Sequence, residues 1–283
     1  MRPDDDGLAC EGAAHRFPVV DGVPVLVDET QIEDDAQYAH QRRYFDEQFA
    51  GYRRYELERW RVSYLNRLRE ADALGGEGAP LIDVAVGGSG YTVIEAAREG
   101  RPAVGCDLSL QGMLAAQRLA EAEGVADSTL FVCCSAQELP FEPAAFDVGL
   151  AIAIIEHVPD DRAALSELAR VLRPGARAFI TVPHDLRHFS PVFRPVNRRH
   201  DRKLGHLRRY SADTLGETCR GLGLTPVEAQ FTGHTVKAVQ IAAGGRLPGA
   251  LDERFWWWCE RRDLAQRRRR RGSMQLSVLA RRA

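Results

Sequence analysis

The chain has 283 residues, of which 45% are hydrophobic and 28% are charged, and its formal net charge is -2. These values are typical of a globular protein with one large domain, and the near-neutral charge gives no reason to expect a stable nucleic-acid partner. No run of about 18 apolar residues could span a bilayer, and the acidic N-terminus lacks the apolar segment of a secretory signal. We therefore expect a soluble, cytoplasmic protein.

The cysteines agree with that compartment. None of the six belongs to a C-x-x-C pair. Cys106, Cys133 and Cys134 lie in apolar, strand-like runs, where a free thiol behaves as a small hydrophobic side chain. A reducing environment fits this usage best.

The N-terminal part predicts two small units before the main domain. Two apolar runs flank Asp21-Gly22, which indicates a hairpin because glycine accepts the positive φ of a tight turn. Residues 1–29 are therefore interpreted as an N-terminal hairpin. Residues 30–78 follow as a helical extension, with Leu57, Trp60 and Leu68 at helical spacing.

From residue 79 the chain alternates between apolar strands and helices. Near-continuous apolar strands separated by helices indicate a parallel sheet that is covered on both faces. The prediction is an α/β, doubly wound, Rossmann-like domain over residues 79–283, with a mostly parallel seven-stranded sheet and a polar substrate-side insertion at 184–210. The predicted strands are 81–86, 102–107, 129–134, 146–153, 176–182, 225–232 and 274–280, and the predicted helices are 91–99, 110–123, 161–172, 211–222 and 251–266.

A cofactor site is predicted where the first of these strands ends. The strand at 81–86 leads into Ala85-Val86-Gly87-Gly88-Ser89-Gly90, and glycine-rich turns there let the backbone approach a ligand. Asp107 ends the next strand, where a carboxylate is placed to accept hydrogen bonds from two ribose hydroxyls. Nicotinamide, flavin and S-adenosylmethionine (SAM) proteins share such a loop, so the loop alone leaves the cofactor open.

Three later motifs distinguish among these cofactors. They are Ser135–Phe141 (SAQELPF), Phe146-Asp147-Val148 leading to Glu156–Asp160 (EHVPD), and Leu172–Gly175 (LRPG). Together with the glycine loop, in this order and spacing, they resemble the class I SAM-dependent methyltransferases, in the branch of the ubiquinone and menaquinone methylases. The resemblance covers about residues 80–235 and implies SAM as the cofactor.

The resemblance also implies a role for each cofactor-site residue. The glycine loop passes beneath the methionine part of SAM, Asp107 holds the ribose, and Leu108 packs on the adenine. The carbonyl near Ala151 meets the methionine amino group. Ser135 stands where the family commonly has Asp, and Ala85 replaces the usual first Gly, so both depart from the pattern. The cofactor-binding residues implied are Ala85, Gly87, Gly88, Gly90, Asp107, Leu108, Ser135, Ala136, Gln137 and Ala151.

A second resemblance lies at the N-terminus. Gly7–Ala13 followed by Phe17–Pro24 is similar to the second half of a small zinc-ribbon module often fused to such methylases. That module needs paired cysteines to complete a tetrahedral site, but Ala13 stands where the second cysteine would be. The resemblance therefore implies a degenerate remnant that binds no metal.

Two histidines are candidate bases for transfer to an oxygen acceptor, which must lose a proton. His157 follows the strand that carries Ala151, and His184 with Asp185 follows the next strand, so both are expected at the open edge of the sheet. A structural role is the alternative for each: His157 in a strand-to-helix turn, and His184 with Asp185 as the cap of a loop.

The stretch 187–209 is basic and is expected on the substrate side. Within it and just beyond, Gly205–Ser211 resembles the family segment that leads to the helix before the sixth strand. An anionic or polyhydroxylated small-molecule substrate is one interpretation, and a solvated loop is the other. The substrate-binding candidates are His206, Arg208, Arg209 and Tyr210.

Near the C-terminus, three adjacent tryptophans cannot share one helical face. Core packing is the first interpretation of Trp256–Trp258, and a weak membrane or dimer contact is the alternative. Arg267–Arg271 is typical of a solvated run, although beside the tryptophans it would also suit an anionic surface.

The functional prediction is a SAM-dependent methyltransferase that acts on a small-molecule acceptor, most simply at a hydroxyl oxygen of a sugar, a quinone-like ring or a specialised metabolite. Two alternatives remain open. One is an RNA methyltransferase, which the net charge and the lack of a complete RNA-binding module disfavour. The other is a non-catalytic SAM-binding partner protein, which the altered Ala85 and Ser135 keep open.

Overall fold

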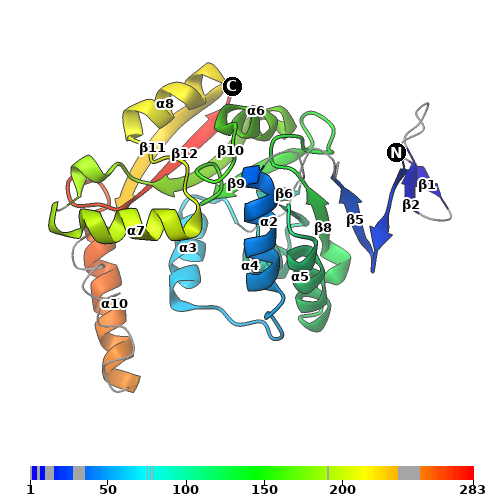
Figure 1. Cartoon of the computed structure of the whole chain (residues 1–283), viewed down its shortest axis with the longest axis horizontal. Coiled ribbons are helices and arrows are strands. Elements are labelled where there is room, and N and C mark those ends of the chain that lie inside the picture. Colours follow the sequence, from blue (N-terminus) through cyan, green and yellow to red (C-terminus); the bar gives the residue numbers. More distant parts are fainter. Residues whose placement is uncertain are drawn as a thin grey trace.

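The computed structural model describes residues 2–4, 7–9, 16–27, 36–74, 76, 78, 80–189, 191–234 and 249–283. A nine-stranded sheet forms its centre (Figure 1). All neighbours from β5 to β10 are parallel, whereas β12 is antiparallel to both β10 and β11, and β4 is antiparallel to β5. The order is β11 (Leu224–Thr232), β12 (Gln275–Arg282), β10 (Leu172–Pro183), β9 (Phe146–Ile152), β6 (Leu81–Val84), β7 (Ala103–Asp107), β8 (Thr129–Cys134), β5 (Val23–Leu26), β4 (Val19–Val20).

The strands from β11 to β8 are the seven that the sequence predicts. The expected count of seven is too low because the hairpin of β4 and β5 joins the same sheet. The turn Asp21-Gly22 closes this hairpin, and Val25 of β5 pairs with Cys133 of β8. A separate three-stranded sheet precedes it, formed by β1 (Arg2–Asp4), β2 (Gly7–Ala9) and β3 (Arg16–Phe17). It lies at the end of the molecule opposite α10 (Figure 1).

Helices cover both faces of the sheet, as expected for a doubly wound fold. On one face Leu168 and Leu215 pack over the sheet, and on the other Ile94 and Met113 do so. Side chains of a strand alternate between the two cores, so Leu81 and its neighbour Ile82 belong to different ones. The first face carries α6 (Asp161–Val171) and α8 (Ala212–Gly221), and the second carries α3 (Arg59–Glu70), α4 (Tyr91–Arg98) and α5 (Leu110–Ala122).

Local hydrogen bonds mark where these helices begin. The side chains of Ser109, Asp160 and Ser211 accept hydrogen bonds from backbone N–H groups in the first turns of α5, α6 and α8. Each satisfies a donor that a helix leaves without an internal partner. Gly175, at φ +81, lies in the early part of β10, where the pairing with β9 is irregular between Leu172 and Arg177.

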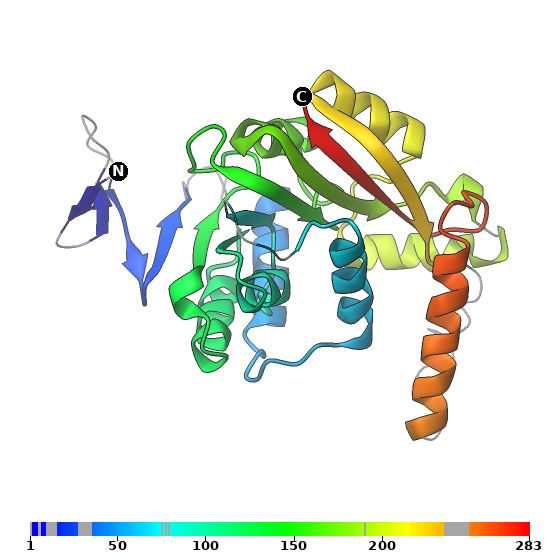
Figure 2. The same ribbon diagram turned by 180° about the vertical axis from the view of Figure 1, so that it is seen from behind.

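The described part of the helical extension contains two helices. α2 (Ala36–Phe49) ends before an irregular stretch, and α3 begins at Arg59 (Figure 2). Leu65 and Leu68 of α3 are fully buried, whereas Trp60 is 45% exposed. The α3 helix therefore packs in the hydrophobic core on this face of the sheet. The α2 helix lies instead over the carboxyl ends of the parallel strands, beside the cavity described below.

The polar stretch 184–210 is not a simple loop, since it contains α7 (Arg194–Leu204). The chain then ends with α10 (Gly249–Ala265), which projects from the body of the molecule, and with β12 (Figure 1). Among the described residues no helix has the length and apolarity needed to cross a membrane. The described cysteines are buried thiols that form no disulfide with one another, and Cys10 lies outside the described residues.

Candidate active site

The glycine loop joins β6 to α4 at the carboxyl end of the parallel strands. Ala85 (φ +67), Gly87 (φ +67) and Gly90 (φ +56) all have left-handed backbone conformations. Glycine takes such conformations without steric cost, but alanine does not, so the loop holds Ala85 in a strained conformation. Strain of this kind persists only where the surroundings fix the backbone.

Asp107 ties this loop to the end of β7. Its Oδ2 accepts a hydrogen bond from the Gly87 N–H and its Oδ1 from the Ser109 N–H, each at 3.0 Å. Burial raises the pKa of Asp107 to about 6, although these backbone hydrogen bonds lower it. A carboxylate oxygen has two lone pairs, so each oxygen can accept a further hydrogen bond from a ligand.

A cavity opens beside Asp107, and it brings together six of the residues singled out from the sequence. Its wall is largely apolar, with Val84, Ile154 and Val158 among the lining residues. Such a wall suits the flat face of a base, and one carboxylate suits the hydroxyls of a sugar. The predicted residues that line it are Ala85, Asp107, Leu108, Ser135, Ala136 and His157.

The other predicted cofactor residues do not line this cavity. A Cβ atom added at Gly88 would lie 2.6 Å from the Cβ of Phe49, and one added at Gly87 would lie 3.1 Å from the Phe49 ring. Phe49 therefore covers this part of the loop. Gly90 is the N-cap of α4. The Gln137 side chain accepts a hydrogen bond from the Asp160 N–H, outside the cavity.

Ala151 is buried within β9, where its neighbours are Val84 and Ile180. The cavity wall is formed instead by Ala153, two residues further on, which lies just beyond the strand with φ +54. Ala153 and not Ala151 therefore lines the cavity, and the contact of a carbonyl near Ala151 with the methionine amino group stays a prediction.

Sequence reasoning missed the contribution of α2 to the cavity. The phenol hydroxyl of Tyr38 lies 3.2 Å from the Ser135 hydroxyl, and Asp46 accepts a hydrogen bond from the Ser109 hydroxyl. A signal was present, because the α2 residues that line the cavity recur at the three- and four-residue steps of one helix face. They are Tyr38, Gln41, Arg42, Phe45 and Phe49.

His157 stands at the far wall of this first cavity. Its ring meets that of His206 edge-on, with 4.7 Å between the ring centroids, and meets Phe45 at 5.7 Å. Burial, together with the neighbouring His206, lowers the pKa of His157 to about 3. The imidazole is therefore neutral at physiological pH and binds a proton only weakly, which makes His157 a poor general base.

A second cavity lies on the other side of this histidine pair. Ala153 lines both cavities, so they adjoin at the end of β9. Glu156 and His206 face the second cavity, and burial raises the pKa of Glu156 to about 8, against the lowering effect of Arg209. The remaining wall combines aromatic, cationic and polar side chains: Trp60, Ser63, Tyr64, Arg67, Asn197, His200, Arg209, Thr232, Glu260, Asp263, Met274 and Gln275.

Of the four substrate-binding candidates, the structure brings only His206 and Arg209 to a cavity. The Arg208 guanidinium donates hydrogen bonds to the Val158 and Pro159 carbonyls at 3.0 and 2.8 Å. The Tyr210 hydroxyl lies 2.7 Å from Asp161. Arg208 and Tyr210 therefore hydrogen-bond to the turn before α6 and line neither of these two cavities, and their role as substrate ligands stays a prediction.

The side chain of His184 lines neither of these two cavities, although its backbone carbonyl accepts a hydrogen bond from Arg209 beside the second one. It is 1% exposed, its Nδ1 lies 2.7 Å from the Ser273 hydroxyl, and its ring stacks on His188. Asp185 binds Arg187 instead of His184. The structure thus buries the His184 ring at the end of β10, and a role for His184 as a base stays a prediction.

The tryptophans of α10 divide between core and surface. Trp256 is 7% exposed, whereas Trp258 is 45% exposed, stacks on Phe255 and lies under the Arg262 guanidinium. In the arginine run, Arg270 pairs with Asp213.

Residues 10–13 of the zinc-ribbon-like segment lie outside the described residues.

The sequence matches a known domain family over its central part. Residues 82–180 match the family described as "Methyltransferase domain". The tRNA 5-carboxymethoxyuridine methyltransferase of Escherichia coli K12 is 41% identical over 90 residues, 31% of this chain and 34% of that protein. The ubiquinone/menaquinone biosynthesis C-methyltransferase of Brucella anthropi is 42% identical over 120 residues, 41% of this chain and 42% of that one. The chain thus spans about a third to two fifths of the length of these two relatives.

Solved structures extend the likeness to the whole fold. The geranyl diphosphate C-methyltransferase from Streptomyces coelicolor A3(2), solved with Mg²⁺, geranyl-S-thiolodiphosphate and S-adenosyl-L-homocysteine, gives a TM-score of 0.62 at 19% identity. The alignment covers 80% of this chain and 77% of that one. Residues 82–180 thus match the methyltransferase domain family, and the fold around them is similar to that of the solved geranyl diphosphate C-methyltransferase.

Proposed function

We propose that the protein transfers a methyl group from SAM, bound in the first cavity, to a hydroxyl oxygen of a small molecule bound in the second. The observation that carries this proposal is the junction of the two cavities at Ala153. Methyl transfer needs donor and acceptor aligned in a site that excludes water, and two adjoining cavities satisfy that need.

The residues of the first cavity fit SAM. Asp107 has free lone pairs for the ribose hydroxyls, and Leu108, Ala136 and Val158 offer an apolar wall to the adenine. Ser135 is tied to Tyr38 of α2, so the helix itself takes part in closing the adenine end. When bound, SAM supplies a methyl group on a positively charged sulfur, whose carbon–sulfur bond breaks as the acceptor bond forms.

The second cavity supports a small polar acceptor. Trp60 and Tyr64 offer aromatic surface to a ring, and Arg67 supplies a cation within a wall that is otherwise rich in hydrogen-bonding groups. The Arg209 guanidinium is held by Asp201 at 2.7 Å and by the His184 carbonyl at 2.8 Å, so it lines the cavity from a fixed position as one half of an ion pair. Together these groups favour a ring-containing acceptor that carries hydroxyl or anionic groups.

A tRNA acceptor is the second candidate. The observation in its favour is the 41% identity to the tRNA methyltransferase, together with the basic side chains on α7. An assay of methyl release over phenols, sugars and tRNA distinguishes the two candidates. Turnover with tRNA alone would replace the small-molecule proposal.

The cofactor assignment is tested by calorimetry with SAM on the Asp107→Ala variant. Removal of a carboxylate that accepts hydrogen bonds costs about 2 kcal/mol, so we expect an affinity about 30-fold weaker. Asp127→Ala is the matched control, because Asp127 is exposed and distant from the cavity. Unchanged SAM affinity in Asp107→Ala would contradict the assignment, as would the absence of SAM binding to the unaltered protein.

A further inference from the structure

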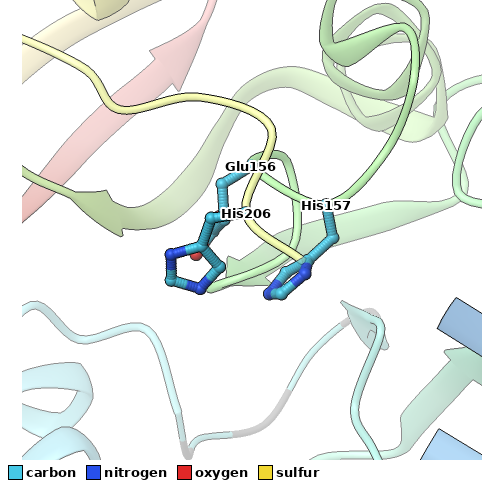
Figure 3. A group of neighbouring side chains, drawn as sticks. All are labelled: Glu156, His157 and His206. Carbon is cyan, nitrogen blue, oxygen red and sulfur yellow. The ribbon is translucent and has the colours of Figure 1, made fainter. Parts of the chain in front are cut away.

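Three side chains meet at the boundary of the two cavities (Figure 3). Glu156, His157 and His206 each offer one ligand atom, and these atoms all lie within 4.8 Å of one another. Figure 3 shows the two imidazole rings next to each other, with the Glu156 carboxyl group behind the ring of His206. His157 lines the first cavity, whereas Glu156 and His206 line the second.

Two of these three residues each carry a buried polar atom without a hydrogen-bond partner in the described part of the chain. Glu156 is 1% exposed and His157 is 8% exposed, and neither Oε2 of Glu156 nor Nδ1 of His157 has a hydrogen bond there. An unpaired polar atom in a protein interior costs about 1 to 3 kcal/mol. A bound ion at this point would satisfy both atoms at once.

His206 is arranged as metal-binding histidines are. Its Nδ1 lies 2.8 Å from Asp201, and the Arg209 guanidinium holds the same carboxylate through two nitrogens. A carboxylate on one ring nitrogen directs the other nitrogen toward a metal and makes it a better ligand. Because the Arg209 guanidinium is paired with Asp201, its positive charge is neutralised and does not repel an ion bound by the three side chains.

We propose that Glu156, His157 and His206 bind one divalent transition-metal ion, with the acceptor oxygen as its open ligand. Two imidazoles and one carboxylate suit Zn²⁺ and related ions, whereas Mg²⁺ prefers oxygen ligands. Three protein ligands with one open position are the arrangement of catalytic rather than structural zinc sites. The proposal that an ion binds here is independent of the proposed function. The proposal that the ion acts on the acceptor oxygen rests on that function.

At this position the ion would act on the acceptor. An oxygen bound to Zn²⁺ loses its proton near neutral pH, and that proton passes to water in the second cavity. The ion would thus promote loss of the acceptor proton, as a general base would. It would also fix the acceptor oxygen beside Ala153, where the two cavities adjoin.

The test is a titration of the chelator-treated full-length protein with Co²⁺, followed by visible absorption, and with Zn²⁺, followed by calorimetry. We expect one ion per chain. Glu156→Gln and His206→Asn should each weaken binding at least about 10-fold, and Asp201→Asn should weaken it about 10- to 100-fold by releasing His206. Circular dichroism spectra show that each variant is folded.

His200→Asn is the matched control, since His200 is the next nearest imidazole, 6.3 Å from His206 between ring centroids. Its ion affinity should equal that of the unaltered protein. The proposal is overturned if neither ion binds stoichiometrically, or if His200→Asn weakens binding as much as His206→Asn. SAM binding is measured by calorimetry on the same samples. If SAM binds but no ion does, only the metal-site inference fails. If an ion binds but SAM does not, only the proposed function fails.

Discussion

Beside the second cavity, His234 and Asp263 form a buried pair whose side chains are 4% and 3% exposed. His234 Nδ1 lies 2.7 Å from Asp263, and its Nε2 lies 2.9 Å from the Arg269 carbonyl. Burial alone would lower the pKa of His234, but the hydrogen bonds to Asp263 and Arg269 raise it above 6.5 overall. Burial would raise the pKa of Asp263, but hydrogen bonds from His234 and Gly233 lower it below 3.8 overall.

Stability should therefore depend on pH through this pair. The raised pKa of His234 stabilises the fold fully below about 6.5, and this contribution is lost as the pH rises through the folded-state pKa. The lowered pKa of Asp263 stabilises it above about 3.8, and this contribution is lost as the pH falls further. We expect the melting temperature to decline from pH 6.5 upward, as measured by calorimetry across that range.

The variant that checks the assignment is His234→Asn, which leaves Asp263 buried without its cation. It should lower the free energy of unfolding by roughly 3 kcal/mol and flatten the decline above pH 6.5. His40→Asn serves as the control, because His40 is exposed on α2. A decline of equal slope in His234→Asn and in the unaltered protein would refute the assignment.

At the scale of elements, α2 is the feature that closes the cofactor cavity. Phe45 and Phe49 stack with ring centroids 5.4 Å apart, and Gln41 donates hydrogen bonds to the Leu204 and Gly205 carbonyls at 3.3 and 3.4 Å. The helix thus spans from the glycine loop to the end of α7. We therefore expect α2 to cover SAM when it is bound in this cavity.

Phe49→Ala should loosen this cover without changing the sheet. The substitution removes a ring that contacts Gly87 and Gly88, and truncation of a buried phenylalanine costs about 3 kcal/mol. Because Phe49 is only partly buried, we expect a smaller effect on SAM: about 10-fold weaker affinity, mainly through faster dissociation in stopped-flow measurements. Glu47→Ala, on the exposed face of α2, should match the unaltered protein. If Phe49→Ala does so as well, α2 is not a lid over SAM.

For the whole molecule, the N-terminal hairpin is part of the central sheet. Val23 and Val25 are 0% and 6% exposed and join the core that α4 and α5 cover. Val19, in the paired strand, is 41% exposed. The hairpin should therefore unfold together with the sheet and not as an independent unit.

Val23→Ala tests this cooperativity. Loss of a buried valine's methyl groups costs about 1 to 2 kcal/mol, which should lower the single melting transition by about 4 °C. Val19→Ala, on the opposite strand of the same hairpin, should leave the transition within about 1 °C. A separate early transition, or equal effects of the two substitutions, would show that the hairpin is not integrated.

Much of the fold follows from local patterns. The apolar run at 129–134, the Ser109 and Ser211 caps and the Asp21-Gly22 turn each act within a few residues, so their elements are visible in the sequence. The pairing of β5 with β8 is not visible there, because about a hundred residues separate two strands that meet only at a sheet edge. The sequence did not predict the helix at Arg194–Leu204, because its many arginines make the stretch look polar throughout and hide the amphipathic periodicity of a helix.

The candidate site divides in the same way. The sequence alone determined the carboxylate at Asp107 and the glycine loop, since both follow directly from where parallel strands end. Only the tertiary structure placed Phe49 over that loop and brought His206 against His157, because these contacts join segments about 40 to 50 residues apart. Strand ends are set by local hydrogen bonding and periodicity, whereas contacts between distant segments depend on how the packed layers share their buried surface.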